Sequence, residues 1–297
     1  MARLNLDAVD ARDLLMPESE QVALYLVGNG GTGSWLAPHL VRIARLFHDL
    51  HGLDTRIMFI DKDKVEERNT YRQNFVPAEI GHFKAEALAL RYSLSAGCAI
   101  TALNKPFVAS EFRGRVENAT LSVFVGCVDN AAARSELESM ITVVQSKKFN
   151  VLLDCGNDRR SGQVIVGTTP SGDKNPFKLF PNHCTWLPKP SVWHKELASE
   201  GVLEKKIGIR RSVRNGKRAR EMSCAEIAMT DQQGLSINAV IASIAADYLV
   251  SILLTQNLNR FATYVDLDGS MKHRYITPRI IKRKTLKESL RGVYDLY

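Results

Sequence analysis

The sequence contains no closely spaced pair of cysteines. Its five cysteines, at positions 98, 127, 155, 184 and 224 of 297 residues, form no Cys-x-x-Cys pair. Structural zinc sites commonly use such pairs, and an odd number of widely scattered cysteines does not indicate a disulfide framework, so we expect neither a zinc site nor disulfides. Scattered free thiols are typical of a reducing compartment, and a cytoplasmic location is therefore the simplest expectation.

Long apolar runs and a leader segment are also missing. No apolar run approaches the roughly 20 residues that span a bilayer. The first residues carry acids early and show no apolar segment of the kind found in signal peptides. With 45% hydrophobic and 24% charged residues, the composition is that of an ordinary globular protein, and no membrane partner is expected.

Acidic residues are absent from one strongly basic segment. Between Lys205 and Arg220 there are eight Lys or Arg residues and no acid, and residues 279–297 carry a net charge of +4. The whole chain carries +8, so the remainder is mildly acidic. Such runs usually form solvated loops or tails. Because no aromatic residues are interleaved with the basic ones, no nucleic-acid partner is expected.

Strands and helices are predicted to alternate through the first half of the chain. Short apolar runs indicate strands, and 3.6-residue periodicity indicates the helices between them. Pro38 is expected in the first turn of its helix, where a missing N–H costs least. This alternation predicts an α/β fold with a doubly wound, mostly parallel sheet. The expected strands are 22–27, 55–60, 98–103, 121–128 and 150–155, and the expected helices are 34–48, 84–96 and 131–146.

The second half is predicted to be less regular. After a strand at 163–168, residues 170–222 are rich in Pro, Gly and basic residues and form a long loop. An apolar core helix is expected at 234–256, then an antiparallel hairpin of strands 262–267 and 271–277 turning at Asp268-Gly269. We expect one domain, 1–278, with loop 170–222 embedded in it, and a basic amphipathic tail, 279–297.

A glycine-rich motif joins the first predicted strand to the first helix. The segment Gly28-Asn-Gly30-Gly31-Thr-Gly33 fits G-x-G-x-x-G. Glycines allow a tight turn and a close approach to a ligand, and the helix N-terminus offers free N–H groups to phosphate oxygens. The motif therefore predicts a nucleotide site at this turn.

Polar residues after the second strand narrow the choice of nucleotide. Asp61 stands at the strand tip, where a ribose hydroxyl is held in dinucleotide-binding folds. An NAD-dependent oxidoreductase explains the glycines and Asp61, but it leaves Arg72 and Lys84 without a purpose. Cations beside a helix N-terminus suit a triphosphate, because charge accumulates as pyrophosphate departs.

Four motifs in order resemble the ThiF/MoeB/HesA family, the adenylation fold shared with ubiquitin-activating enzymes. They are G-x-G-G-x-G-S at 28–34, D-x-D-x-V-x-x-x-N-x-x-R-Q at 61–73, G-x-x-K at 81–84 and C-x-D-N at 127–130. The chain is also similar to ThiF-like proteins of bacterial PRTRC-type loci. The resemblance implies a Rossmann-like domain in which loop 170–222 is a crossover loop above the nucleotide.

The resemblance also implies roles for individual residues. Asp61 would bind the ribose, and Asp129 would hold Mg²⁺, a metal that prefers a few carboxylates plus phosphate oxygens. A second interpretation of Asp129-Asn130 is a helix N-cap, because a helix follows at once. The phosphate contacts would come from Asn69, Arg72 and Lys84, and the nucleotide site would also include Gln73 and Asn130.

The implied reaction is adenylation of the C-terminal carboxylate of a small ubiquitin-like protein, with ATP and Mg²⁺. A sulfur-carrier protein of cofactor biosynthesis with the same Gly-ended tail is the alternative partner, and the resemblance implies a homodimer. A carboxylate is already ionised at neutral pH, so no general base is needed.

A cysteine that accepts the activated acyl group is a further possibility. Ser223-Cys224-Ala-Glu226 fits a capping box, which would place Cys224 at a helix N-terminus, where a thiol pKa is lowered. Its surroundings also look similar to the catalytic-cysteine segment of ubiquitin-activating enzymes. Cys184 is the second candidate, and a buried, inert thiol is the alternative interpretation for Cys224.

Overall fold

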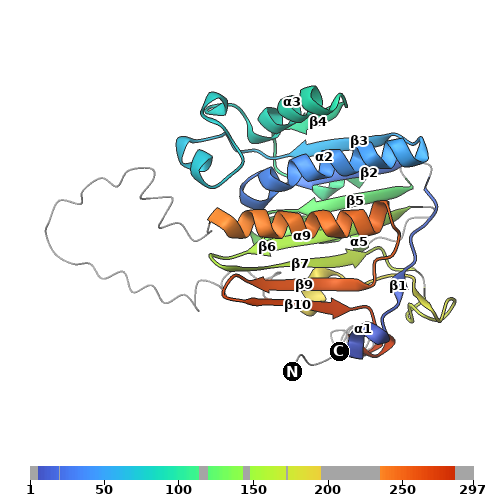
Figure 1. The fold of residues 1–297 in the computed structure, drawn as a ribbon. Helices are drawn as coiled ribbons and strands as arrows, with labels where there is room; N and C mark the ends of the chain where they lie inside the picture. The colour runs from blue at the N-terminus through green and yellow to red at the C-terminus, as the bar shows by residue number, and fades with distance from the viewer. Residues whose placement is uncertain are drawn as a thin grey trace, which may run out of the picture.

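An eight-stranded sheet in the order β10-β9-β7-β6-β5-β2-β3-β4 forms the centre of the computed structural model (Figure 1). The structure describes residues 6–19, 21–113, 120–142, 148–171, 173–194 and 235–284. The strands are β2 (Val22–Val27), β3 (Thr55–Ile60), β4 (Ile100–Leu103), β5 (Leu121–Gly126), β6 (Phe149–Asn157), β7 (Ser161–Thr168), β9 (Arg260–Asp266) and β10 (Ser270–Tyr275).

The sheet has a parallel half and an antiparallel half. Strands β4, β3, β2, β5 and β6 are parallel, whereas β7, β9 and β10 each run antiparallel to their neighbours. This confirms the predicted mostly parallel, doubly wound fold with a C-terminal antiparallel hairpin. The antiparallel half begins one strand before that hairpin, at β7, because β6 and β7 are joined by a tight turn at residues 158–160.

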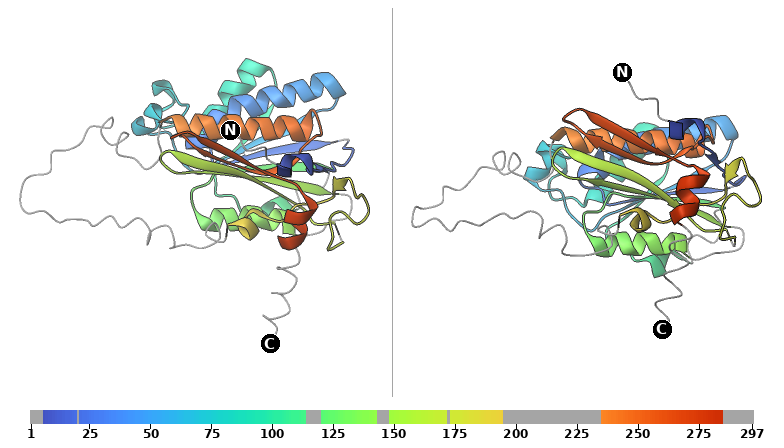
Figure 2. Two further views of the ribbon diagram at one scale, coloured as in Figure 1. Left: turned by 60° about the horizontal axis from the view of Figure 1, so that its bottom comes forward. Right: turned by 90° about the horizontal axis from the view of Figure 1, so that it is seen from below.

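Helices cover both faces of the sheet (Figure 2). On one face lie α2 (Gly31–His51), α3 (Lys84–Ala96) and α9 (Leu235–Leu253), and on the other lie α4 (Ala109–Arg113), α5 (Ala131–Thr142) and α6 (Pro190–Trp193). The short elements are α1 (Leu6–Val9), the 3-10 helices η1 (Glu67–Tyr71) and η2 (Pro77–Glu79), and a two-stranded sheet of β1 (Asp13–Leu14) and β8 (His183–Cys184).

Helix α9 is the central helix of the core, as predicted. By length and composition alone, its residues 236–253 could also cross a membrane. Its packing accounts for its apolar character, because it contacts α2, β6 and β7 and its Ile241, Ala245 and Leu249 are fully buried. The phenol of Tyr248, also fully buried, is hydrogen-bonded to Thr263 Oγ1 at 2.9 Å.

Helix α2 begins earlier than predicted, and Pro38 therefore lies inside it. The helix starts at Gly31 rather than at residue 34, so the expectation that Pro38 occupies the first turn is wrong. A proline inside a helix cannot donate to the carbonyl four residues earlier, which is that of Ser34. Asn74 Nδ2 donates to Ser34 O instead, at 3.2 Å, so a side chain from a distant loop satisfies this carbonyl.

Parts of the predicted loop and tail lie outside the described residues. Of the expected loop 170–222, the structure describes residues up to 194 except residue 172, and the basic run 205–220 lies outside the described residues. Residues 278–284 of the basic tail region form a helix whose Ile281 is fully buried, so this part belongs to the packed fold.

Candidate nucleotide-binding site

The predicted site residues gather at one edge of the parallel half. The glycine loop follows β2, Asp61 follows β3, and Cys127 to Asn130 follow β5. Strand β2 lies between β3 and β5, so the chain reverses its direction of winding at this point. In doubly wound sheets, ligands bind in the crevice beyond the carboxyl ends of strands at such a reversal.

Two glycines of the loop are required by geometry. Gly28 has a φ of +84°, and a Cβ on it would lie 2.6 Å from Cys127 O. A Cβ on Gly33 would lie 1.9 Å from Gly28 O. The loop thus folds tightly against the end of β5, and no larger residue fits at either position without movement of the backbone.

The other two glycines leave space at the start of α2. Gly30 is the N-cap of the helix and provides no side-chain cap, and Gly31 is the first helical residue. A Cβ on Gly30 would meet only Gln73 Nε2, at 3.9 Å. The first N–H groups of an uncapped helix are available to an anion, which is the condition for binding a phosphate.

Asp61 is hydrogen-bonded to the glycine loop. Its Oδ2 accepts a hydrogen bond from Asn29 N at 2.6 Å, and its Oδ1 accepts one from Asp63 N at 2.8 Å. Burial raises the pKa of the Asp61 carboxyl, while these hydrogen bonds and the charge of Lys84 act in the opposite direction. The carboxylate therefore has a structural role beyond the predicted ribose contact.

Lys84 is a buried cation beside this carboxylate. Only 7% of the residue is exposed. Its Nζ lies 3.6 Å from Asp63 Oδ2, and its backbone N donates to Asp63 O at 2.9 Å. A buried ammonium is costly without negative partners, and polyphosphate oxygens are such partners.

The segment with Asn69, Arg72 and Gln73 is folded around Asn69. The Asn69 side chain accepts a hydrogen bond from Glu66 N at 2.9 Å, and its backbone O accepts from Arg72 N at 3.2 Å and Gln73 N at 2.8 Å. Asn69 is 4% exposed, and its hydrogen bonds stabilise the turn at residues 66–73. Trp35 Nε1 donates to Arg72 O at 3.2 Å and ties the turn to α2.

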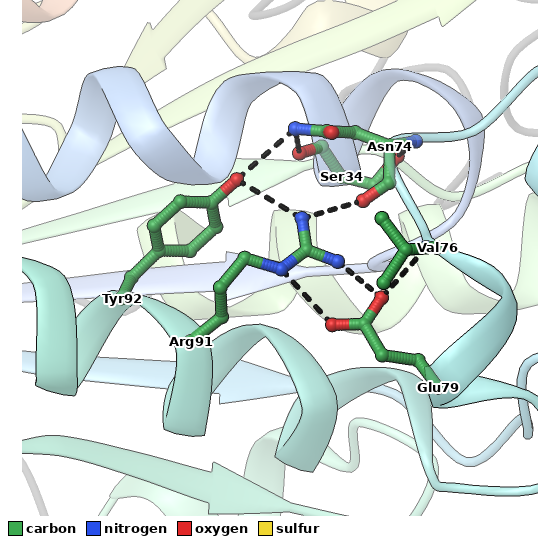
Figure 3. A network of polar contacts seen from close by, with 6 residues as sticks. All are labelled: Ser34, Asn74, Val76, Glu79, Arg91 and Tyr92. Atoms are coloured by element: carbon green, nitrogen blue, oxygen red, sulfur yellow. Dashed lines mark hydrogen bonds and ion pairs between the residues drawn. The ribbon is translucent and has the colours of Figure 1, made fainter.

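A polar network then holds this segment between α2 and α3 (Figure 3). Arg91 donates from Nη1 to Asn74 O at 2.9 Å and from Nε to Glu79 Oε1 at 2.9 Å. Asn74 N donates to Ser34 Oγ at 2.9 Å. Asn74 Nδ2 contacts both Ser34 O and the Tyr92 hydroxyl, so one amide joins three elements. The network fixes the loop that carries Arg72 and Gln73.

Of the two roles predicted for Asp129-Asn130, the structure shows the helix cap, and the metal role of Asp129 stays a prediction. Asn130 Oδ1 accepts a hydrogen bond from Ala133 N at 2.8 Å, so Asn130 caps α5. Asp129 is exposed, and its Oδ1 lies 3.4 Å from Asn130 Nδ2. Among the described residues there is no group of three metal-binding side chains. A single carboxylate fits Mg²⁺ only where phosphate oxygens and water supply the other ligands.

Unsatisfied amides mark the inside of the site. Asn29 is completely buried, and within the described residues neither its Oδ1 nor its Nδ2 has a hydrogen-bond partner. The same is true of Gln73 Oε1, in a residue that is 6% exposed. Buried polar atoms are normally paired, so these atoms, beside an open helix N-terminus, fit a polar ligand such as a nucleotide.

The comparison with protein families decides what kind of protein this is. The model of the ThiF family matches residues 10–287. The chain belongs to the ThiF family. Membership supports ATP-dependent adenylation of a substrate carboxylate as the class of reaction. None of the curated proteins compared with the sequence gave a match.

One solved structure supports the fold. PaaA has a TM-score of 0.52 at 15% identity, over 86% of this chain and 72% of PaaA. E. coli MccB solved with ATP has a TM-score of 0.49 at 13% identity, over 86% of this chain and 64% of MccB. At 15% identity the likeness to PaaA is one of fold, and the chain spans less than two thirds of MccB.

The cysteines of this ThiF-family chain differ in accessibility. Cys184 is fully buried, its Sγ donates to Trp186 O at 3.0 Å, and burial raises its pKa to about 12. The pKa of Cys155 is also raised, first by hydrogen bonding to Cys127 and then by burial. Neither Cys184 nor Cys155 offers a thiolate near neutral pH. The candidate Cys224 lies outside the described residues.

A second set of polar residues supports the site and was not predicted. Asn157 Nδ2 donates to Asn238 Oδ1 at 2.9 Å, and the Thr32 hydroxyl lies within 3.4 Å of both amide oxygens. These contacts join β6, α9 and the first turn of α2. Thr32 lies inside the glycine motif, so the sequence marks its position. Its partners are 125 and 206 residues away in the chain, so the sequence does not show these contacts.

Proposed function

We propose that this chain uses ATP to adenylate the C-terminal carboxylate of a small ubiquitin-like protein. One arrangement carries the proposal. The glycine loop and the uncapped N-terminus of α2 meet the buried ammonium of Lys84 around the carboxylate of Asp61. Open N–H groups and a cation in one crevice suit a polyphosphate.

Each residue has a defined task in the proposal. Lys84 and Arg72 neutralise the charge that develops as pyrophosphate leaves, and the N–H groups of α2 orient the phosphates. A carboxylate oxygen of the partner attacks the α-phosphorus of ATP, the bond to pyrophosphate breaks, and an acyl adenylate and pyrophosphate result. Mg²⁺, held by Asp129, would add positive charge at the phosphates. Catalysis then rests on position and charge, because the partner's carboxylate is already ionised.

Two alternatives differ from this proposal in testable ways. A sulfur-carrier protein would undergo the same reaction and differs only as a partner. An NAD-dependent oxidoreductase would need a dinucleotide and would not need Lys84 beside the phosphates. The ThiF family match favours adenylation over hydride transfer.

Calorimetry with ATP–Mg²⁺ and with NAD separates the two classes. We expect the full-length protein to bind ATP–Mg²⁺ more tightly than NAD, and Lys84→Met to weaken ATP binding about tenfold or more, since one charged contact to phosphate contributes at least ~1.4 kcal/mol. Lys62→Met, which alters an exposed lysine just after β3, serves as the control. Tighter binding of NAD, or equal ATP affinity of wild type and Lys84→Met, would reject the proposal.

We further propose Cys224 as the residue that receives the acyl group, if transfer follows adenylation. The inert environment of Cys184 supports this choice among the two candidates. Incubation with ATP, Mg²⁺ and the cognate partner should give a thiol-sensitive conjugate with wild type and Cys184→Ser, but none with Cys224→Ser. A conjugate that persists in Cys224→Ser would reject the assignment.

A further inference from the structure

A cavity lies at the opposite end of the strands from the candidate nucleotide site. It has a volume of about 670 Å³ and is lined by residues of α1, α6, β9, β10 and the helix 278–284. Strand β9 reaches the carboxyl edge of the parallel strands at Asp266, which pairs with Ser161. Phe261, at the opposite end of β9, lines the cavity. We call this cavity the basic pocket.

Aromatic rings form one wall of the basic pocket. Trp193 stacks on Phe261 with ring centroids 4.2 Å apart, and Tyr264 lies along the same strand. Arg274 pairs with Ala262 and Tyr275 with Arg260, so Phe261 is the additional residue of a β-bulge. A bulge re-aims a side chain, and here it brings Phe261 to the face of the sheet that carries Tyr264.

Basic residues also line the pocket. Five basic residues and one acid line the pocket, which gives the lining a net charge of +4: Lys272, Arg274, Arg279, Arg283, Lys284 and Asp7. Within the part of the chain that the structure describes, no ion pair involves Lys272, Arg274, Arg279 or Arg283. These four residues are exposed, and Asp7 is the one acid among the lining residues, so the positive potential at this surface would attract an anion.

Contacts within the fold hold part of the pocket lining in place. Lys284 Nζ donates to Val192 O at 3.1 Å and lies 5.2 Å from the centre of the Trp193 ring. His194 Nε2 and the Tyr264 hydroxyl are 2.6 Å apart. These contacts tie the helix 278–284 to α6 and His194 to β9, so the fold fixes the aromatic part of the lining.

We propose that the basic pocket binds a small phosphate-bearing molecule with a planar ring, the chemical class of nucleotides. Arginines at 274, 279 and 283 suit phosphate oxygens, because a guanidinium offers paired donors. Trp193 and Tyr264 are partly exposed and can contact a flat ring, whereas Phe261 is 2% exposed and supports Trp193 from behind. The volume lies in the range of small-molecule sites. This site is separate from the one proposed for ATP, since its residues and its end of the sheet are different.

The chain has three tryptophans, one of them in each site, so tryptophan variants can assign a fluorescence change to a site. Trp193 lines the basic pocket, whereas Trp35 contacts Arg72 at the candidate nucleotide site. We would titrate the full-length protein with AMP, adenosine and inorganic phosphate. AMP should change the fluorescence of wild type and of Lys84→Met, and this change should be absent in Trp193→Phe. Adenosine and inorganic phosphate should each bind at least tenfold more weakly than AMP.

Charge-matched variants then test the location. Arg274→Glu/Arg279→Glu should weaken AMP binding at least tenfold. Arg42→Glu/Arg45→Glu, which makes the same change of charge on the exposed face of α2, should leave it unchanged. Equal weakening by both pairs, or AMP binding that is lost only in Lys84→Met, would overturn the proposal. Binding of inorganic phosphate as tight as AMP would overturn the assignment of a ring-bearing ligand.

Discussion

At the scale of single residues, Gly33 and Gly30 offer a matched test of the glycine loop. A Cβ on Gly33 would lie 1.9 Å from Gly28 O, so Gly33→Ala forces the backbone apart. We expect it to lower the free energy of unfolding by roughly 1–3 kcal/mol, the usual cost of overpacking. Gly30→Ala meets no atom closer than 3.9 Å and should change stability by less than about 0.5 kcal/mol.

The two variants should differ again in ligand binding. Gly30→Ala places a methyl group where phosphate approaches the helix N-terminus, so it should weaken ATP binding about tenfold while the fold stays intact. Urea denaturation and calorimetry measure the two effects. If Gly30→Ala binds ATP as wild type does, the phosphate does not lie at this helix terminus.

Asp129 and Asn130 separate a catalytic role from a capping role. Asp129 is exposed, so Asp129→Ala should alter the free energy of unfolding by less than about 0.5 kcal/mol. It should nevertheless lower the rate of pyrophosphate exchange roughly 10²–10³-fold, as loss of one preorganised charge does. Asn130→Ala removes the cap of α5 and should cost about 1 kcal/mol of stability. An Asp129→Ala protein with nearly full exchange activity would reject the metal role.

At the scale of elements, Pro38 and Asn74 should be energetically coupled. Pro38 leaves the Ser34 carbonyl without its helical partner, and Asn74 Nδ2 supplies one at 3.2 Å. Asn74→Ala leaves this carbonyl without a hydrogen-bond partner and should lower the free energy of unfolding by roughly 1–2 kcal/mol. In a Pro38→Ala background the new N–H can bond to Ser34 O, so the same change should cost less, by about 0.5–1 kcal/mol. Strictly additive free energies of unfolding would show that the contact is not formed.

Arg134 joins α5 to β6 and gives a pH-dependent prediction. Its Nη1 lies 3.5 Å from Asp154 Oδ2, and its Nη2 donates to Val128 O at 3.1 Å. Burial raises the pKa of Asp154, and Arg134 opposes that rise. Arg134→Ala leaves a buried carboxylate unpaired and should destabilise the fold by roughly 3–5 kcal/mol at neutral pH.

The sign of the pH effect follows from linkage. In Arg134→Ala the pKa of Asp154 is raised further in the folded state, so the folded state binds this proton more tightly than the unfolded state. The stability deficit should therefore shrink as pH falls below that raised pKa and grow as pH rises through it. Arg134→Ala/Asp154→Asn should show little of this dependence. A deficit that is constant between acidic and neutral pH would contradict the account.

Sequence patterns predicted the features that depend on residues close together in the chain. The glycine loop, Asp61 at the tip of β3 and the apolar helix α9 follow from neighbouring residues, and the structure has them where they were predicted. Helix α2 starts three residues before the predicted position 34, because its first turn is formed by glycine-motif residues that lie outside the apolar periodicity. Pro38 therefore lies inside the helix. Its tolerance depends on Asn74, 36 residues later. Sequence periodicity does not show which distant side chain will donate a hydrogen bond to a carbonyl that a proline leaves without its helical partner.

At the scale of the whole molecule, the unpredicted features are contacts between distant segments. Thr32, Asn157 and Asn238 meet only when β6, α2 and α9 are packed together. The bulge at Phe261 depends on the register between β9 and β10. The Asp268-Gly269 turn motif predicts a hairpin but does not determine this register. The fold class was thus accessible from the sequence, and the nucleotide site stays a prediction whose motif residues lie at one edge of the sheet. The supporting contacts and the basic pocket required the packed structure.

The most direct test of the central claim is ATP–pyrophosphate exchange with a candidate ubiquitin-like partner in two forms. One form carries a free C-terminal carboxylate, and the other is identical but amidated at its C-terminus. Adenylation needs the carboxylate as nucleophile, so we predict exchange with the first form, no exchange with the second, and exchange lowered roughly 10²–10³-fold in Arg72→Ala. Equal exchange with both forms, or none with any partner that the protein binds tightly, would contradict the claim that this chain activates a C-terminal carboxylate.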